Sequence, residues 1–277
     1  MARQAVAALP GIREVRMKVE AEVPRGFGLP GRRDIPCVRQ VIAVASGKGG
    51  VGKSTVAVRL ALALAEAGAK VGLLDADFFG PNVPQMLGSE DRPMLRNNRL
   101  VPVEARGLQV MSFAYLVEPG KPLIWRGPLL MSAMQQMLFD VDWGELDYLV
   151  IDLPPGTGDV PLSLVQLISL AGVVVVTTPQ NVAVADVVRC IEMLQVTGAP
   201  VLGVVENMSY LQCPDCGVCT QMLSIVTVLA KPRPRGWPPA GTRAVSHLTC
   251  FACTHCGRRL EVFGRGGGQW LAEQPEH

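Results

Sequence analysis

The chain has 277 residues, of which 49% are hydrophobic and 18% are charged. This composition is typical of a globular protein with a sizeable core, and it excludes a disordered chain. The formal net charge is only +2, so the charge balance does not favour nucleic acid or an anionic membrane as the main partner.

The start of the chain carries no long apolar stretch, and we therefore expect no secretory signal. No apolar run further along reaches the roughly 20 residues that a membrane-spanning helix requires. We expect a cytoplasmic protein with neither a membrane nor nucleic acid among its partners. A mitochondrial or plastid location is the alternative, since Arg3, Arg13 and Arg16 suit a transit peptide, although the nearby Glu14 and Glu20 oppose one.

Residues 1–36 are interpreted as an N-terminal remnant and a linker, because they end in a stretch rich in glycine and proline. In residues 37–212, short apolar strands alternate with helices. Strands are expected at 41–46, 71–74, 148–151, 173–176 and 201–205, and helices at 54–67, 127–139, 160–170 and 182–197. Strands that are apolar on both faces indicate a parallel sheet covered by helices on each side. The predicted fold is a doubly wound α/β domain with a mostly parallel sheet, which binds its ligand at the carboxyl ends of the strands.

A phosphate-binding loop stands between the first of these strands and the first helix. Its sequence, Gly47-Lys-Gly-Gly-Val-Gly-Lys-Ser54, matches the Walker A pattern in the strand-to-helix context that the pattern requires. Backbone N–H groups surround the phosphates in such a loop, while Lys53 is expected to reach the β- and γ-phosphates and Ser54 to ligate Mg²⁺. The residues predicted to contact ATP are Gly47, Gly49, Gly50, Val51, Gly52, Lys53, Ser54 and Thr55. The chain is therefore predicted to be an ATPase with the P-loop NTPase type of α/β fold.

Acidic residues close the second and third predicted strands. Asp75 and Asp77 follow the second strand, and Asp152 follows the third. We expect Asp152 to hold the water shell of Mg²⁺, Asp75 to support the metal or its waters, and Asp77 to orient the attacking water. Helix capping is the alternative role for an aspartate at a strand end. Asn207, beyond the last predicted strand, is expected to meet adenine, with a turn-forming role as its alternative.

The last part of the chain, residues 213–277, has no α/β periodicity and is rich in cysteine. Six of the eight cysteines lie between residues 213 and 256, and in a chain without a secretory signal such clustering indicates metal ligation before disulfides. Cys213-Pro-Asp-Cys-Gly217 recurs as Cys253-Thr-His-Cys-Gly257. The candidate metal ligands are therefore Cys213, Cys216, Cys253 and Cys256, and structural zinc held by these four thiolates is one alternative. The other two, Cys37 and Cys190, are interpreted as a linker residue and a buried helix residue.

A second lysine in the phosphate loop, Lys48, makes the loop resemble the deviant Walker A of the MinD/ParA/nitrogenase-iron-protein class. In that class the early lysine crosses a dimer interface to the partner's nucleotide. The resemblance therefore implies a homodimer in which Lys48 belongs to the catalytic residues, together with Lys53, Asp77 and Asp152. A solvated lysine is the alternative.

Over about residues 38–217 the chain resembles the Mrp/ApbC group of iron–sulfur cluster carrier ATPases. The motifs that carry the resemblance are Gly47–Thr55, Asp75–Pro81, Trp125–Pro128, Asp152–Asp159, Thr178–Gln180, Glu206–Tyr210 and Cys213–Cys216. The resemblance implies that Cys213 and Cys216 of two protomers bind one bridging 4Fe–4S cluster. It also implies that ATP binding or slow hydrolysis governs delivery of the cluster to apo iron–sulfur proteins.

The chain departs from this family pattern in two ways. Residues 217–252 look inserted, so Cys253 and Cys256 compete with Cys213 and Cys216 for the role of the family's cysteine pair. Family members also continue through another strand and helices beyond the point that corresponds to His277.

Two rival functions fit parts of the sequence. A MinD- or ParA-like positioning ATPase needs an amphipathic membrane helix or a basic DNA face, and residues 257–277 offer neither. A zinc-stabilised scaffold that binds nucleotide without transferring a cluster is the other. The cluster carrier is the function that we expect, mainly because the chain resembles the family of cluster carriers.

Overall fold

The computed structural model describes residues 31–89, 91–116, 127–217 and 219–221, and the short stretches 251–252, 255–256 and 259–260. Most of the expected N-terminal remnant and linker, and most of the segment that looks inserted, lie outside these ranges. Among the described residues, no helix combines the length and the apolar character needed to cross a membrane.

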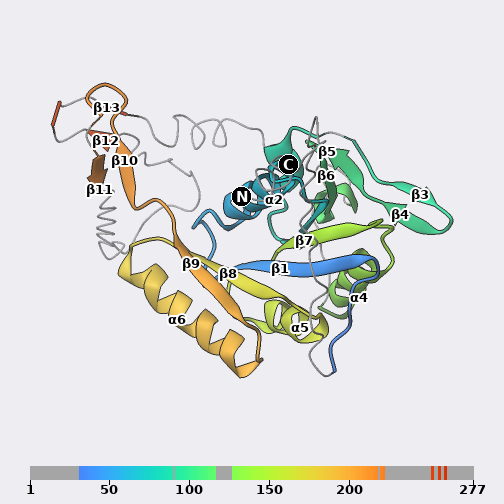
Figure 1. The fold of residues 1–277 in the computed structure, drawn as a ribbon. Coiled ribbons are helices and arrows are strands. Elements are labelled where there is room, and N and C mark those ends of the chain that lie inside the picture. The colour runs from blue at the N-terminus through green and yellow to red at the C-terminus, as the bar shows by residue number, and fades with distance from the viewer. Residues whose placement is uncertain are drawn as a thin grey trace, which may run out of the picture.

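A seven-stranded sheet forms the centre of the molecule, in the order β5-β6-β2-β7-β1-β8-β9. All neighbouring strands are parallel except the edge pair of β5 and β6. The strands are β1 (Val38–Ser46), β2 (Val71–Asp75), β5 (Val103–Ala105), β6 (Leu108–Ser112), β7 (Leu146–Asp152), β8 (Gly172–Thr177) and β9 (Val201–Glu206). The predicted mostly parallel α/β fold is thus confirmed (Figure 1).

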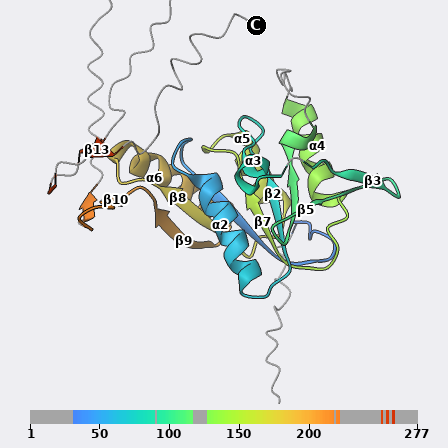
Figure 2. The ribbon, with the colours of Figure 1, turned by 90° about the horizontal axis from the view of Figure 1, so that it is seen from above.

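Helices cover both faces of this sheet (Figures 1 and 2). One face packs against α2 (Lys53–Glu66) and α3 (Val83–Leu87), and the other packs against α4 (Gly127–Phe139), α5 (Asp159–Leu167) and α6 (Asn181–Val196). Successive side chains of a strand point to opposite faces. In β1, accordingly, Ala43 and Ala45 join the core under α4, α5 and α6, whereas Val44 joins the core under α2. Both faces of the central strands are therefore apolar and buried, as the strand composition predicted, whereas the edge strand β9 is exposed along most of its length.

Each predicted helix and strand of the parallel sheet is present within a few residues of its expected bounds. The strand β6 was not predicted, although it pairs with β2 along its whole length. Several small elements were not predicted either: the edge strand β5, the short helix α3, the hairpin of β3 (Met94–Arg96) and β4 (Arg99–Val101), and a 3-10 helix at Phe113–Leu116. Cys190 is fully buried on α6, as predicted.

Beyond β9 the chain forms two more short hairpins. The first pairs β10 (Tyr210–Gln212) with β11 (Cys219–Gln221), and the second pairs β12 (Phe251–Ala252) with β13 (Arg259–Leu260). In both views of the ribbon the two hairpins lie together, at the end of the molecule where β9 leads (Figures 1 and 2). The described residues of the cysteine-rich segment thus belong to a small antiparallel unit beside the parallel sheet.

Candidate nucleotide-binding site

The phosphate loop joins the carboxyl end of β1 to the first turn of α2. Gly52 is the N-cap of α2, with φ at 86°, and no side chain caps the helix there. The N–H groups of the first helical turn therefore have no intrahelical partner and no side-chain acceptor, and the positive end of the helix dipole points into the loop. Such an arrangement binds phosphate oxygens.

Two glycines of the loop lie so close to neighbouring elements that a side chain at either position would overlap them. A Cβ at Gly47 would overlap the backbone of α6 at Asp186 and Val187. A Cβ at Gly52 would overlap the side-chain nitrogen of Asn207, and the left-handed backbone at Gly52 already disfavours other residues. The loop is therefore wedged between α6 and the residues that follow β9.

Lys53 carries the charge at the centre of the site. Its Nζ lies 2.7 Å from Oδ1 of Asp152 and 3.5 Å from Oδ2 of Asp77, and the residue is only 5% exposed. An ammonium group this deeply buried is stabilised by its carboxylate partners. The sequence placed these three residues in one site, and the structure brings them together.

Asp75 and Asp152 stand opposite each other on the paired strands β2 and β7. Three donors converge on Asp75: the N–H of Asp77 at 3.2 Å, the N–H of Val83 at 3.1 Å and the hydroxyl of Ser112 at 2.9 Å. Burial, and then the negative charge of Asp152, raise the pKa of Asp75 to about 7. Burial also raises the pKa of Asp152, while the nearby charge of Lys53 opposes that rise.

Ser54 and Asp152 have the donor atoms that a hard divalent cation prefers. The Ser54 hydroxyl hydrogen-bonds Asp152, and the buried Oδ2 of Asp152 has no hydrogen-bond partner among the described residues. An orphaned carboxylate oxygen beside a hydroxyl is costly unless a cation or its water shell completes it. The site therefore fits Mg²⁺, with these two residues and Asp75 as the ones that would hold the ion or its waters.

Asp77 begins the loop after β2 and faces the lysine. Its N–H donates to Oδ1 of Asp75, and its own Oδ1 accepts the N–H of Phe79 at 3.3 Å. The other oxygen, Oδ2, is the one that approaches Lys53. Asp77 is thus held by its backbone within reach of the phosphate loop, where a water-orienting carboxylate is needed.

Asn207 touches the phosphate loop directly. Its Nδ2 donates to the carbonyl oxygen of Val51 at 2.9 Å, and its backbone N–H donates to the carbonyl of Thr177 at 2.8 Å. The predicted contact with adenine stays a prediction, but the residue does lie at the edge of the loop that the sequence assigned to ATP. Lys48 is half-buried, and among the described residues no carboxylate pairs with its ammonium group.

Ser112 is a site residue that the sequence analysis missed. It ends β6, and its hydroxyl is one of the groups that fix the Asp75 carboxylate. The strand β6 is short and its loop has no motif, so no signal in the sequence marked this serine.

Three of the four predicted metal-ligating cysteines are described, and they converge. The Sγ atoms of Cys213, Cys216 and Cys256 all lie within 4.8 Å of one another. Backbone N–H groups of Cys216 and Asp215 lower the pKa of the Cys213 thiol, which favours the thiolate that metals bind. Cys253, the fourth predicted ligand, lies outside the described residues.

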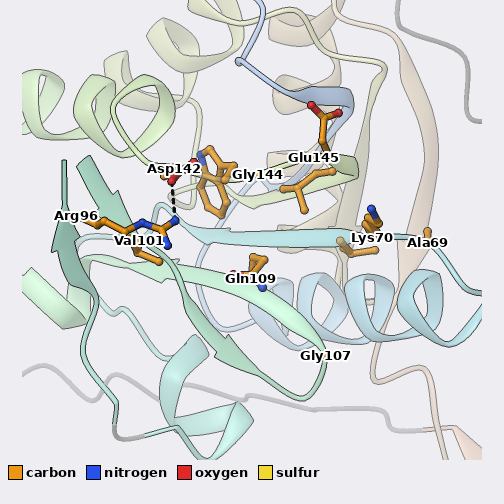
Figure 3. A pocket seen from close by; sticks show the side chains of 12 residues that line it. Ala69, Lys70, Arg96, Val101, Gly107, Gln109, Asp142, Gly144 and Glu145 are labelled. Carbon is orange, nitrogen blue, oxygen red and sulfur yellow. Dashed lines mark hydrogen bonds and ion pairs between the residues drawn. The ribbon is translucent and has the colours of Figure 1, made fainter. Parts of the chain in front are cut away.

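A hollow of about 420 Å³ lies at the amino-terminal ends of the strands, at the opposite end of the sheet from the phosphate loop (Figure 3). It is lined by residues at the starts of β2, β6 and β7, and Arg96 pairs with Asp142 across one side at 3.0 Å. Parallel α/β sheets bind their ligands at the carboxyl ends of the strands. This hollow is therefore separate from the phosphate loop, which lies at those carboxyl ends.

The fold, the phosphate loop and the buried pair of Lys53 and Asp152 define the chain as a P-loop NTPase. A model of the ParA group, described as the NUBPL iron-transfer P-loop NTPase, matches residues 37–230. The chain belongs to this family of iron-transfer P-loop NTPases.

Individual relatives agree with this membership. An iron–sulfur cluster carrier protein of Synechocystis is 50% identical over 217 residues, which cover 76% of this chain and 62% of the relative. The iron–sulfur cluster transfer protein NUBPL of Mus musculus is 53% identical over 192 residues, covering 68% of this chain and 60% of the relative. The chain thus spans about three fifths of the length of these two relatives.

Among solved structures, a nucleotide-binding protein of Archaeoglobus fulgidus in complex with ADP is similar. It has a TM-score of 0.60 and 45% sequence identity, and the match covers 68% of this chain and 74% of that protein. The fold of the sheet and its helices is therefore shared with a protein that holds a nucleotide.

Proposed function

We propose that the chain is an ATP-binding and ATP-hydrolysing carrier that holds a labile 4Fe–4S cluster between two copies of itself and delivers it to apo iron–sulfur proteins. Membership in an iron-transfer family supports the cargo, and the ADP complex of the archaeal relative supports the nucleotide. The phosphate loop supports ATP because its glycines, its lysine and its uncapped helix together suit a polyphosphate.

One observation carries the proposal that nucleotide and cargo are linked. Asn207 hydrogen-bonds the phosphate loop at Val51, and the same short segment leads through β10 to the buried Cys213. A shift of the loop on binding or losing the γ-phosphate would therefore act on the segment that holds the thiolates. Such a two-state element at the nucleotide is how other NTPases pass on the state of the phosphate.

We assign hydrolysis to the charged and polar residues around the phosphate loop. Lys53 and the loop N–H groups would neutralise the phosphates, and Ser54 and Asp152 would hold Mg²⁺, which offsets charge on the β- and γ-oxygens. Asp77 would orient the attacking water. Lys48 would complete the site of a second copy, since it lacks a carboxylate partner among the described residues of its own chain.

The cargo assignment is tested by anaerobic reconstitution of the metal-free chain with iron and sulfide. We expect the sulfide-to-iron charge-transfer absorption of a cluster, with one cluster for every two chains. This absorption should be lost in the Cys213→Ser/Cys216→Ser double variant and retained in Cys37→Ser. A cluster-loaded chain should also activate an apo 4Fe–4S enzyme. Uptake of zinc alone, with no cluster under these conditions, would leave the nucleotide-binding scaffold as the function.

A further inference from the structure

The cysteine-rich segment contains two hairpins of the same design. The strands β10 and β11 flank the loop that carries Cys213 and Cys216, and the strands β12 and β13 flank the loop that carries Cys256. The pentapeptide repeat in the sequence therefore coincides with a repeated hairpin. Because the hairpins lie together, cysteines 43 positions apart in the chain meet in space (Figure 1).

The separations between the sulfur atoms indicate how many metal ions they suit. Sγ of Cys213 lies 3.6 Å from Sγ of Cys256, and no pair among the three exceeds 4.8 Å. Thiolates that share one tetrahedral zinc ion, at a Zn–S distance of about 2.3 Å, lie about 3.8 Å apart. In a 4Fe–4S cubane each thiolate binds a different iron, so the sulfurs must stand farther apart than those that share one ion. The observed separations match a single ion.

The surroundings of the three thiols also suit such an ion. Cys213 is only 2% exposed, Cys216 is half-buried and Cys256 is exposed. The turn after Cys213 is closed by a hydrogen bond of 2.9 Å from the Gly217 N–H to the Cys213 carbonyl, which holds Cys213 and Cys216 on one side of the loop. An ion bound here would be held by two cysteines of the first hairpin, and it would be accessible to solvent on the side of the exposed Cys256.

We propose that Cys213, Cys216 and Cys256 bind one Zn²⁺ ion within a single chain. This goes beyond the carrier function proposed above, and it requires no second copy of the chain. The carrier site uses Cys213 and Cys216 from two chains, so an ion inside one chain and a cluster between two chains exclude each other at this pair. Zinc would therefore hold the chain in a state that cannot carry a cluster until Cys256 and the ion are displaced.

The test titrates Zn²⁺ alone into the full, reduced, metal-free chain against a chromophoric chelator, with Co²⁺ as an optical probe of thiolate ligation. We expect one ion per chain in protein that stays monomeric. Cys256→Ser should weaken zinc binding by at least about a hundredfold, because a ligand matters more than the outer contacts whose loss costs about ten- to a hundredfold. The matched control Cys37→Ser, an exposed cysteine before β1, should bind as the unaltered chain does.

A second variant separates loss of a ligand from damage to the hairpin. Cys256→His should recover most of the affinity, since imidazole nitrogen is also a zinc ligand. One ion per two chains, or zinc binding by Cys256→Ser as tight as in the unaltered chain, would overturn the proposal.

Cluster reconstitution keeps the two proposals distinguishable. Cys256→Ser should still assemble a cluster, because that function needs only Cys213 and Cys216. Loss of the cluster together with zinc in this variant would make Cys256 a cluster ligand and overturn the single-ion site. A chain that binds zinc at one per chain but never assembles a cluster would refute the carrier function and leave the zinc site standing.

Discussion

The ammonium group of Lys53 forms ion pairs with two carboxylates at once, at 2.7 Å from Asp152 and 3.5 Å from Asp77. Asp152 is fully buried, so its charge would be costly without the lysine. When the lysine turns to the phosphates of ATP, these carboxylates need another cation. Mg²⁺ bound with the nucleotide would supply it, which gives a physical reason to expect that metal and nucleotide bind together.

Lys53→Ala should abolish nucleotide binding and also destabilise the fold. Breaking a buried ion pair by removing one partner costs about 3 kcal/mol or more, because the remaining charge is left unpaired. Isothermal titration with Mg·ATP should show no heat, and urea unfolding at about pH 8 should show the loss of stability. Normal ATP binding by this variant would mean that the phosphate site is wrongly assigned.

The stability loss in Lys53→Ala should depend on pH in a definite direction. Burial raises the pKa of Asp152, and without Lys53 it should rise further. The cost of the charged carboxylate is present in full above this raised pKa and is relieved as the pH falls through it. The loss should therefore be smaller at about pH 5.5 than at about pH 8. Lys53→Met, which keeps most of the side-chain volume, separates this charge effect from lost packing.

Asp77→Ala should keep nucleotide binding and lose turnover. The carboxylate lies at the start of the loop after β2, and the role that we propose for it is to orient water rather than to hold the phosphates. Loss of a group that assists proton transfer or positions the nucleophile lowers the rate by about a hundredfold or more. Phosphate release and ATP titration measure the two effects separately. Asp142→Ala, which removes an exposed carboxylate at the opposite edge of the sheet, should change neither.

The parallel sheet and the nucleotide site were largely predictable from the sequence because each rests on a local signal. Strands such as β8 contain a continuous apolar run, and the phosphate loop is a contiguous motif. The strand β6 and Ser112 were not found, since that short strand is defined by its partner β2 rather than by its own composition. The contact between Asn207 and Val51 joins residues 156 positions apart, which no sequence spacing reveals.

The cysteines also show what the sequence alone could not predict. Their residue types and the repeated pentapeptide predicted a metal site, but not the number of ions or chains that share it. That question depends on the distance between Cys213 and Cys256, which is set by two hairpins packing together. That distance is a product of tertiary structure, which sequence periodicity cannot predict.

Gly52→Ala should destabilise the loop in a way that depends on Asn207. Alanine at φ 86° is strained by about 1 to 2 kcal/mol, and its Cβ would also overlap the Asn207 side chain. In an Asn207→Ala background the overlap disappears, and only the backbone strain remains. The double-mutant cycle, measured by denaturant unfolding, should therefore give a coupling energy of about 1 kcal/mol or more.

Gly68→Ala is the matched control for this cycle. Its φ is 96°, and a Cβ there would meet nothing within 4 Å, so it measures the backbone strain alone. Equal costs of Gly52→Ala in both Asn207 backgrounds would show that the two side chains do not compete for space.

Mixing two inactive variants tests whether Lys48 acts on the nucleotide of a second copy. Lys48→Ala and Asp77→Ala should each lose ATP turnover as pure proteins. In a mixed dimer, the site on the Lys48→Ala chain keeps its own Asp77 and receives Lys48 from its partner, so that site is complete. Random mixing makes about half of the dimers mixed, each with one working site of two, so about a quarter of normal activity should return. If Lys48 served only its own nucleotide, both sites of the mixed dimer would lack a residue and mixing would restore nothing.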